Sequence, residues 1–121
     1  MDLELLREYC ISKPGVEETT PFGPDTLVFK VMGKVFLLTG FENSPVRFNV
    51  KCDPEKAIDL RDRYNCVLPG FHMNKKHWNT IVVDGSVNIK LVKEWIDDSY
   101  NLVTEGLTKR EKDNLHKVKY Q

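Results

Sequence analysis

Residues 27–39 have the sequence LVFKVMGKVFLLT, in which two apolar runs flank Gly33. Val, Leu and Phe dominate both runs, and a glycine between two such runs is typical of a tight β-hairpin. Residues 46–51, VRFNVK, then alternate apolar and polar side chains. That alternation predicts a strand with one buried face and one face in water. A hairpin beside an alternating strand favours a single α+β domain, an antiparallel sheet with helices packed mainly on one face.

Helical spacing predicts a first helix near the N-terminus, ended by the sequence KPG at 13–15. A second helix should begin at Asp53-Pro54, because aspartate caps free N–H groups and proline suits the first turn. Ser86 is expected to cap a third and longest helix. The positions expected to face the core are Leu3, Leu6 and Cys10, then Ala57, Leu60 and Tyr64, then Ile89, Val92, Ile96, Ser99 and Val103.

The other segments are assigned by their turn-forming residues. Residues 16–26 contain Pro21, Gly23 and Pro24 and are predicted to be a loop. A strand is expected at residues 81–83, followed by a turn at Asp84-Gly85. Residues 1–107 should form one domain without an internal repeat or linker. Residues 108–121 form a polar, basic tail. The sequence is compatible with either a short helix or a frayed end there.

Composition narrows the class of protein. The chain of 121 residues has 40% hydrophobic and 30% charged residues, which is typical of one globular domain. No apolar run approaches the roughly 18 residues that span a bilayer, the N-terminus lacks a signal-peptide pattern, and the three cysteines have no C-x-x-C spacing. We therefore expect a cytoplasmic protein without a membrane partner. Net charge is zero, but residues 1–26 are acidic and residues 27–52 and 107–121 are basic. The sequence therefore allows a local basic face.

Catalytic, metal and cofactor sites are not expected. His72 and His77 are five residues apart and the cysteines are scattered, which does not match zinc-ligand spacing. There is no nucleotide-binding glycine loop and no nucleophile motif. Asp97 and Asp98 would diverge by about 100° on a helix and do not form a pair. The alternative is a small enzyme in which His72 or His77 acts as a base.

Residues 69–80, PGFHMNKKHWNT, concentrate cations, amides and aromatic rings in one short segment. Nucleic-acid binding needs cations for phosphates and amides or rings for bases. The candidate nucleic-acid contacts are Arg47, Lys51, His72, Asn74, Lys75, Lys76 and His77. Structural roles are expected for Pro69, Gly70, Trp78 and Asn79. The competing interpretation is a solvated sheet face and a loop whose polar groups hydrogen-bond its own backbone.

The same segment resembles the signature of the MmcQ/YjbR family of small bacterial proteins. Further matches occur in family order and cover roughly residues 3–107: KV-GKVF within residues 30–36, KCDPE at 51–55 with LR at 60–61, and SY-LV within 99–103. Phe71 departs from the pattern, since many members have tyrosine there.

The resemblance implies an α+β fold like that of type III secretion chaperones, with a predicted "double wing" DNA-binding domain and no enzymatic activity. The resulting hypothesis is binding of double-stranded DNA, with Lys75 and Lys76 on phosphates and Arg47 and Lys51 assisting. Its rival is a protein-interaction module that binds a protein partner and no nucleic acid. Neither hypothesis calls for a cofactor or a metal.

Overall fold

The computed structural model describes residues 1–41 and 44–119, with four helices and six strands. In chain order the elements are α1 (Leu3–Ile11), β1 (Val16–Thr19), β2 (Thr26–Val31), β3 (Lys34–Gly40), β4 (Arg47–Lys51), α2 (Pro54–Arg63), β5 (Val67–Pro69), β6 (Trp78–Val82), α3 (Ile89–Glu105) and α4 (Lys109–Lys119). The strands form one sheet in the order β1-β2-β3-β4-β6-β5, and every neighbouring pair is antiparallel. The predicted α+β fold and the predicted hairpin of β2 and β3 are both confirmed.

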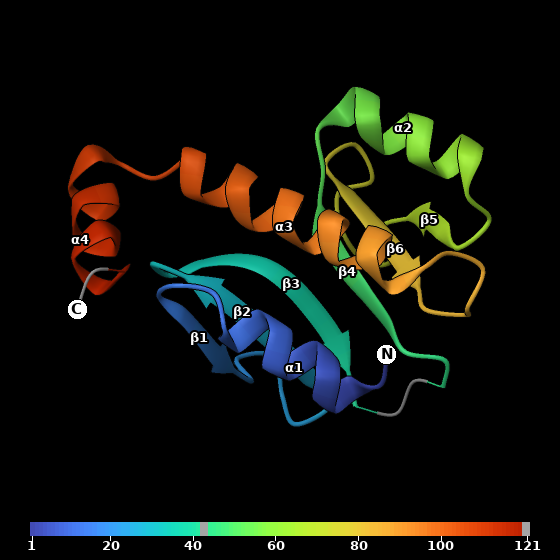
Figure 1. The fold of residues 1–121 in the computed structure, drawn as a ribbon, viewed down its shortest axis with the longest axis horizontal. Helices are drawn as coiled ribbons and strands as arrows, with labels where there is room; N and C mark the ends of the chain where they lie inside the picture. Colours follow the sequence, from blue (N-terminus) through green and yellow to red (C-terminus); the bar gives the residue numbers. More distant parts are fainter. Residues whose placement is uncertain (42–43, 120–121) are drawn as a thin grey trace.

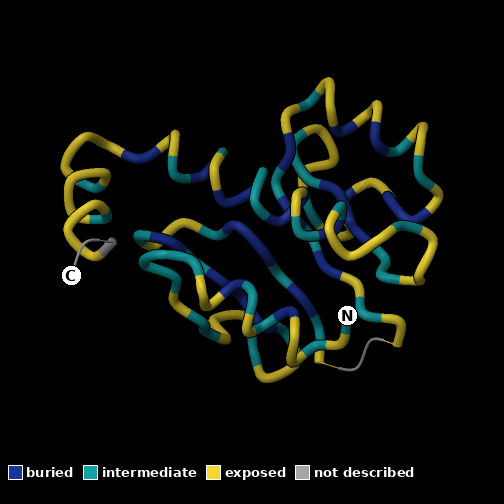
Figure 2. The backbone as a smooth tube through the Cα atoms, viewed as in Figure 1, coloured by how far each residue is buried: buried dark blue, intermediate teal, exposed yellow. Residues whose placement is uncertain are grey.

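One side of the sheet carries the core. Buried side chains of α1, α2 and α3 form a single cluster with alternate positions of the strands, such as Phe29 on β2 and Phe48 on β4. Figure 1 shows α3 running along the central strands, with α2 at the end of the sheet that holds β5 and β6. Burial is concentrated in those strands and on the inward sides of the helices (Figure 2). The helices therefore leave the opposite surface of the sheet uncovered.

We call that surface the open face. It is formed by the strand positions that alternate with the core positions, among them Leu38, Arg47, Asn49, Lys51 and Thr80. Because side chains on a strand point to alternate faces, the polar positions of the sequence VRFNVK all fall on this side. The face expected to lie in water is thus the one that the structure leaves open.

Two predicted elements have different bounds. Residues 16–26 were expected to be a loop, but Val16–Thr19 form the edge strand β1, paired with β2 from Val16↔Val31 to Thr19↔Val28. The strand expected at 81–83 is β6, which begins earlier, at Trp78. Both differences arise from pairing with other strands, β1 with β2 and β6 with β4 and β5, which local composition does not report.

The start of the third helix was also predicted wrongly. Its N-cap is Asn88, whose side chain accepts a hydrogen bond from the Leu91 N–H, and not Ser86. Ile89 is 37% exposed and does not face the core, whereas the other four predicted positions of that helix are buried. In the second helix Asp53 is the cap as predicted, with Pro54 in the first turn.

The C-terminal segment folds back on the N-terminal part of the chain. Residues Lys109–Lys119 form α4, and Leu115 packs against the core as a partly buried side chain. The Cδ1 atom of Leu115 lies 2.6 Å from where a Cβ on Gly15 would stand. Glycine is suited to this position because it permits the close approach and the positive φ of 72°.

Candidate functional site

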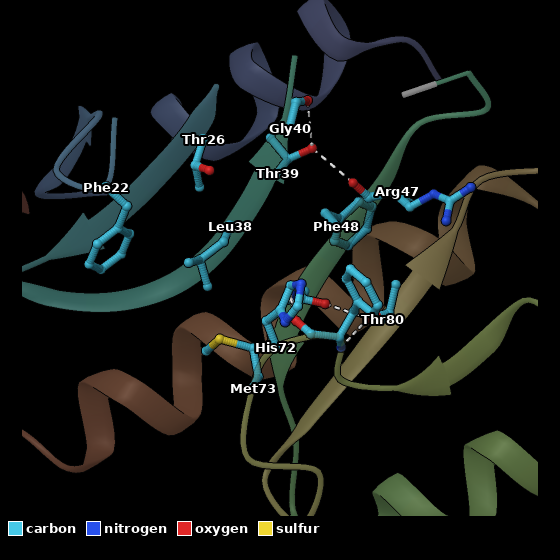
Figure 3. Close-up of a pocket in the computed structure, with 12 residues that line it drawn as sticks. Phe22, Thr26, Leu38, Thr39, Gly40, Arg47, Phe48, His72, Met73 and Thr80 are labelled. Carbon is cyan, nitrogen blue, oxygen red and sulfur yellow. Dashed lines mark hydrogen bonds between the residues drawn. The ribbon is translucent and has the colours of Figure 1, made fainter. Parts of the chain in front are cut away.

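A cavity of about 540 Å³ opens on the open face of the sheet. Strands β2, β3, β4 and β6 form its floor. The segment between β1 and β2 forms one wall, and the segment between β5 and β6 forms the other. Figure 3 shows Phe22 on one side and His72 and Met73 on the other, with Leu38 between them. Its volume is in the usual range for small-molecule sites. We call this cavity the open-face pocket.

A row of side chains across the sheet gives the pocket its floor. Leu38 on β3 pairs with Asn49 on β4, and Asn49 pairs in turn with Thr80 on β6. Neighbouring strands lie about 4.8 Å apart, so these paired residues stand side by side on the same face. Antiparallel register therefore places one apolar and two polar side chains in a line beneath the cavity.

Three residues join this floor to the wall of the pocket. The Thr80 hydroxyl donates a hydrogen bond to the Asn49 Oδ1 and accepts one from the Phe71 N–H at 2.9 Å. The Asn49 Nδ2 donates to the Phe71 carbonyl oxygen at 3.0 Å. Both backbone groups of Phe71 are thereby held, and the segment that carries it is fixed over the sheet.

We call residues 70–77, between β5 and β6, the signature loop. Its backbone bonds partly to the sheet and partly to groups of the loop itself. The Asn74 carbonyl oxygen accepts from the His77 and Trp78 N–H groups, and the Asn74 side chain accepts from the Lys76 N–H. The Lys75 ammonium donates to the Gly70 carbonyl oxygen at 3.1 Å. Asn74 and Lys75 therefore organise the loop. The structural interpretation of this segment anticipated such bonds for Asn74, whereas it expected Lys75 to be solvated.

The loop closes on β6 at Gly70. The Gly70 N–H donates to the Trp78 carbonyl oxygen at 2.9 Å, and a Cβ on Gly70 would lie only 2.8 Å from Trp78 atoms. Pro69 ends β5 opposite Asn79, and Trp78 is half-buried on the open face opposite Lys51. Gly70 is thus required for the close packing of the loop against Trp78.

Asn79 points away from the pocket, toward the helices. It is fully buried, and its Nδ2 donates to the Ala57 carbonyl oxygen on α2 at 3.3 Å. Its Oδ1 has no hydrogen-bond partner among the described residues. The amide joins α2 to β6 and takes no part in the pocket.

The structure brings some of the predicted contact residues together and separates others. Arg47 is exposed at the start of β4, and both Arg47 and His72 line the pocket. Lys51 is half-buried on the same face, about 13 Å along β4 from Arg47 at the usual rise per residue. Lys76 is exposed on the signature loop, whereas His77 is half-buried and its carbonyl oxygen accepts from the Cys52 N–H.

Several pocket residues were not predicted from the sequence. Phe22, Leu38, Met73 and Thr80 all line the cavity. Phe22 and Phe71 are conspicuous because each is a large apolar residue with a high exposed fraction, 69% for Phe22 and 67% for Phe71. A Phe between Pro21 and Gly23, in a segment with few other apolar residues, was the available signal for an exposed ring.

The charge of the pocket has one sign. Its lining contains Arg47 and His72 and no Asp or Glu among the described residues. On the helix side, by contrast, Asp97 pairs with Lys13, and Asp98 pairs with Lys56 at 2.7 Å. The pocket is therefore suited to an anionic or neutral ligand with an apolar part.

The cysteines lie outside this site. Burial raises the pKa of the Cys10 thiol to about 12 and that of the Cys52 thiol to about 11. Thiols with raised pKa values are poor nucleophiles and poor metal ligands at neutral pH. Within residues 1–41 and 44–119 no group of three or more His, Cys, Asp or Glu side chains is placed to hold a metal ion. In the same residues no helix has the length and apolar character needed to cross a membrane.

Known proteins share both the sequence and the fold. A model of the YjbR family matches residues 11–102. The chain is 38% identical to uncharacterized protein YbdF of Escherichia coli O157:H7, over 93% of this chain and 92% of that protein. It is 34% identical to uncharacterized protein YjbR of E. coli K12, over 83% and 85% of the two chains.

Solved structures agree with the fold described above. A Deinococcus radiodurans protein of the DUF419 domain family superposes with a TM-score of 0.87 at 41% identity, covering 94% of this chain and 87% of that one. A Pseudomonas syringae protein superposes with a TM-score of 0.73 at 26% identity, covering 84% and 98%.

Proposed function

The chain belongs to the YjbR family, and we propose that it binds DNA through the open face and the signature loop. One observation carries the proposal: Arg47, His72 and the signature loop meet at a pocket with no carboxylate among its described lining residues. Phosphate contacts from cations supply most of the affinity of DNA-binding proteins. The proposal assigns binding, and no catalytic step.

Three cations, two on the open face and one on the signature loop, have defined roles in this proposal. Arg47 and Lys76 are exposed and would contact phosphates directly, and Lys51 would add a third contact at the far end of β4. Lys75 is assigned a different role from the one expected, because its ammonium donates to the Gly70 carbonyl oxygen and holds the loop. His72 and Asn49 would make polar contacts within the pocket.

The zero net charge of the chain is compatible with a local basic surface. The acidic side chains of α1 and α3 lie on the helix side of the sheet, where Asp97 and Asp98 are already paired with lysines. Arg7 of α1 is paired with Glu18 of β1 in the same way, at 2.8 Å. DNA approaching the open face would therefore meet Arg47 before these carboxylates.

The test is a fluorescence-anisotropy titration of labelled DNA at low and at moderate salt. We expect binding that weakens as salt rises, because each neutralised phosphate releases counterions. The double variant Arg47→Gln/Lys76→Gln should bind about tenfold more weakly and show a shallower salt dependence. Lys109→Gln/Lys112→Gln on α4 removes the same charge from exposed positions and is the matched control. Absence of binding at low salt, or an equal loss in both double variants, would refute the proposal.

A protein-interaction module is the second candidate, and one groove favours it. A cavity of about 330 Å³ lies between α1 and the start of α3, where Leu5 is 52% and Ile89 is 37% exposed. Such a groove can accept an apolar side chain of a protein partner. This candidate expects a partner whose binding does not depend on salt and is lost in Leu5→Glu. Recovery of nucleic acid alone from the same purification would count against it.

A further inference from the structure

We propose that the open-face pocket accepts one unstacked nucleobase, so that the protein binds single-stranded or distorted DNA in preference to intact duplex. The inference rests on the proposed function and specifies the form of DNA that the site recognises. In a duplex the bases are stacked and paired, and a cavity of about 540 Å³ can be entered only by a base that has left the stack.

The exposed rings support a planar occupant. Phe22 comes from the segment between β1 and β2, and Phe71 comes from the signature loop. Each ring is about two-thirds exposed, at 69% and 67%, although rings of this size are usually buried. Proteins that bind single strands use exposed aromatic side chains of this kind as stacking surfaces, because every base has a π-face.

The Phe71 ring is positioned before any ligand binds. Asn49 and Thr80 hold both backbone groups of Phe71, and its ring packs against the His72 ring with centroids 4.1 Å apart. His72 itself has a positive φ of 59°. Ordering the wall in advance lowers the entropic cost of binding, which favours this wall as the stacking surface.

The floor offers a polar edge that matches a base. Asn49 uses one N–H on the Phe71 carbonyl oxygen and one Oδ1 lone pair on the Thr80 hydroxyl. An Asn side chain has two N–H donors and two acceptor lone pairs, so one N–H and one lone pair have no partner among the described residues. A donor and an acceptor on one amide are the groups with which Asn recognises adenine. Arg47 also lines the pocket, and in Figure 3 its guanidinium extends away from Leu38 and His72, so it would contact a phosphate outside the cavity and not the inserted base.

The experiment compares three labelled DNAs of the same length: intact duplex, single strand, and duplex with one unpaired adenine. We expect the single strand and the unpaired-adenine duplex to bind at least about tenfold more tightly than intact duplex. Phe22→Ala and Phe71→Ala should each remove most of that preference. Ile58→Ala, which truncates a 55% exposed apolar side chain on α2, is the control. Phe22 lies outside the signature loop, so its variant remains informative if Phe71→Ala disturbs the loop.

Each outcome separates this inference from the proposed function. Equal binding of the three DNAs, lost only in Arg47→Gln/Lys76→Gln, would overturn the base pocket and support DNA binding. Absence of binding to all three would overturn both. Deoxyadenosine monophosphate is titrated in parallel. If it binds as tightly as the single strand, the pocket is a site for a free nucleotide and the DNA-strand inference is wrong.

Discussion

The Ser99 hydroxyl donates a hydrogen bond to the Phe36 carbonyl oxygen at 2.6 Å and accepts one from the Lys51 N–H at 2.8 Å. One fully buried side chain on α3 therefore satisfies backbone groups of both β3 and β4. Ser99→Ala would leave a buried carbonyl and a backbone N–H without this partner. We expect the free energy of unfolding to fall by about 1–3 kcal/mol, as measured by urea denaturation.

The matched control for this change is Ser86→Ala, because Ser86 is exposed. Surface substitutions of this kind usually alter stability by less than about 0.5 kcal/mol. A loss in Ser99→Ala no larger than that in Ser86→Ala would contradict the bridging role.

The N-terminus of α3 provides a second prediction. Asn88 Oδ1 accepts from the Leu91 N–H at 2.8 Å, so this side chain satisfies one of the free N–H groups of the helix. Asn88→Ala should lower the free energy of unfolding by about 1 kcal/mol. Asn88→Ser should retain most of this capping contribution, because serine is also a good N-cap residue. Thermal unfolding followed by circular dichroism would measure both. Equal stability of Asn88→Ala and the unchanged protein would show that the cap is dispensable.

The approach of Gly70 to Trp78 provides a third prediction. A Cβ on Gly70 would lie 2.8 Å from the Trp78 carbonyl oxygen, so Gly70→Ala must displace the loop or β6. We expect a lower Tm and changed amide chemical shifts across residues 70–78. Gly106→Ala is the control: its Cβ would have ordinary contacts from 3.5 Å, and its φ is −81°. A Tm unchanged in Gly70→Ala would contradict the close packing.

Sequence patterns predicted the parts of this fold that depend on local periodicity. The hairpin around Gly33, the alternating strand before Asp53 and the buried stripe of α3 all follow from spacings of two or 3.6 residues. Strands β1 and β5 have only four and three residues and exist through pairing with β2 and β6. Segments that short carry too little periodicity to be recognised on their own.

The same distinction explains what was missed in the candidate site. Arg47 and His72 were selected by residue type, and both line the pocket. Leu38 and Thr80 have no unusual chemistry, and they meet at Asn49 only because three strands pair in one register. Register is a property of the assembled sheet, so residue composition alone could not place this row.

The buried thiols provide a fourth prediction. Burial raises the pKa of Cys10 from 9.0 to about 12, so its thiolate is scarce in the folded protein. Labelling of Cys10 by a thiol reagent at neutral pH should be slow in the native state and fast in urea. Because the unfolded thiol ionises near 9.0 and the folded one near 12, stability should also fall as pH rises above 9.0. Cys10→Ala should reduce that alkaline loss, and rapid labelling of the native thiol would contradict its burial.

The start of α4 provides a fifth prediction, which concerns acid. The Glu111 carboxylate accepts from the Thr108 N–H at 3.0 Å, while the Thr108 hydroxyl accepts from the Glu111 N–H at 3.1 Å. Hydrogen bonds to Thr108 lower the pKa of Glu111 below its ordinary 4.5. The Thr108 backbone has the larger effect and its side chain the smaller one.

A carboxylate with a lowered pKa stabilises the folded state above its unfolded pKa, and this contribution is lost as the pH falls through the folded value. An NMR titration of the Glu111 carboxyl should therefore show a midpoint below 4.5 that returns to 4.5 in urea. The shift of the Thr108 amide, whose N–H is bonded to this carboxylate, should follow the same midpoint. Glu111→Gln keeps an acceptor oxygen but has no charge to titrate, so the transition at that midpoint should disappear from the Thr108 amide in this variant. A native midpoint at or above 4.5 would show that the Thr108–Glu111 pair does not form.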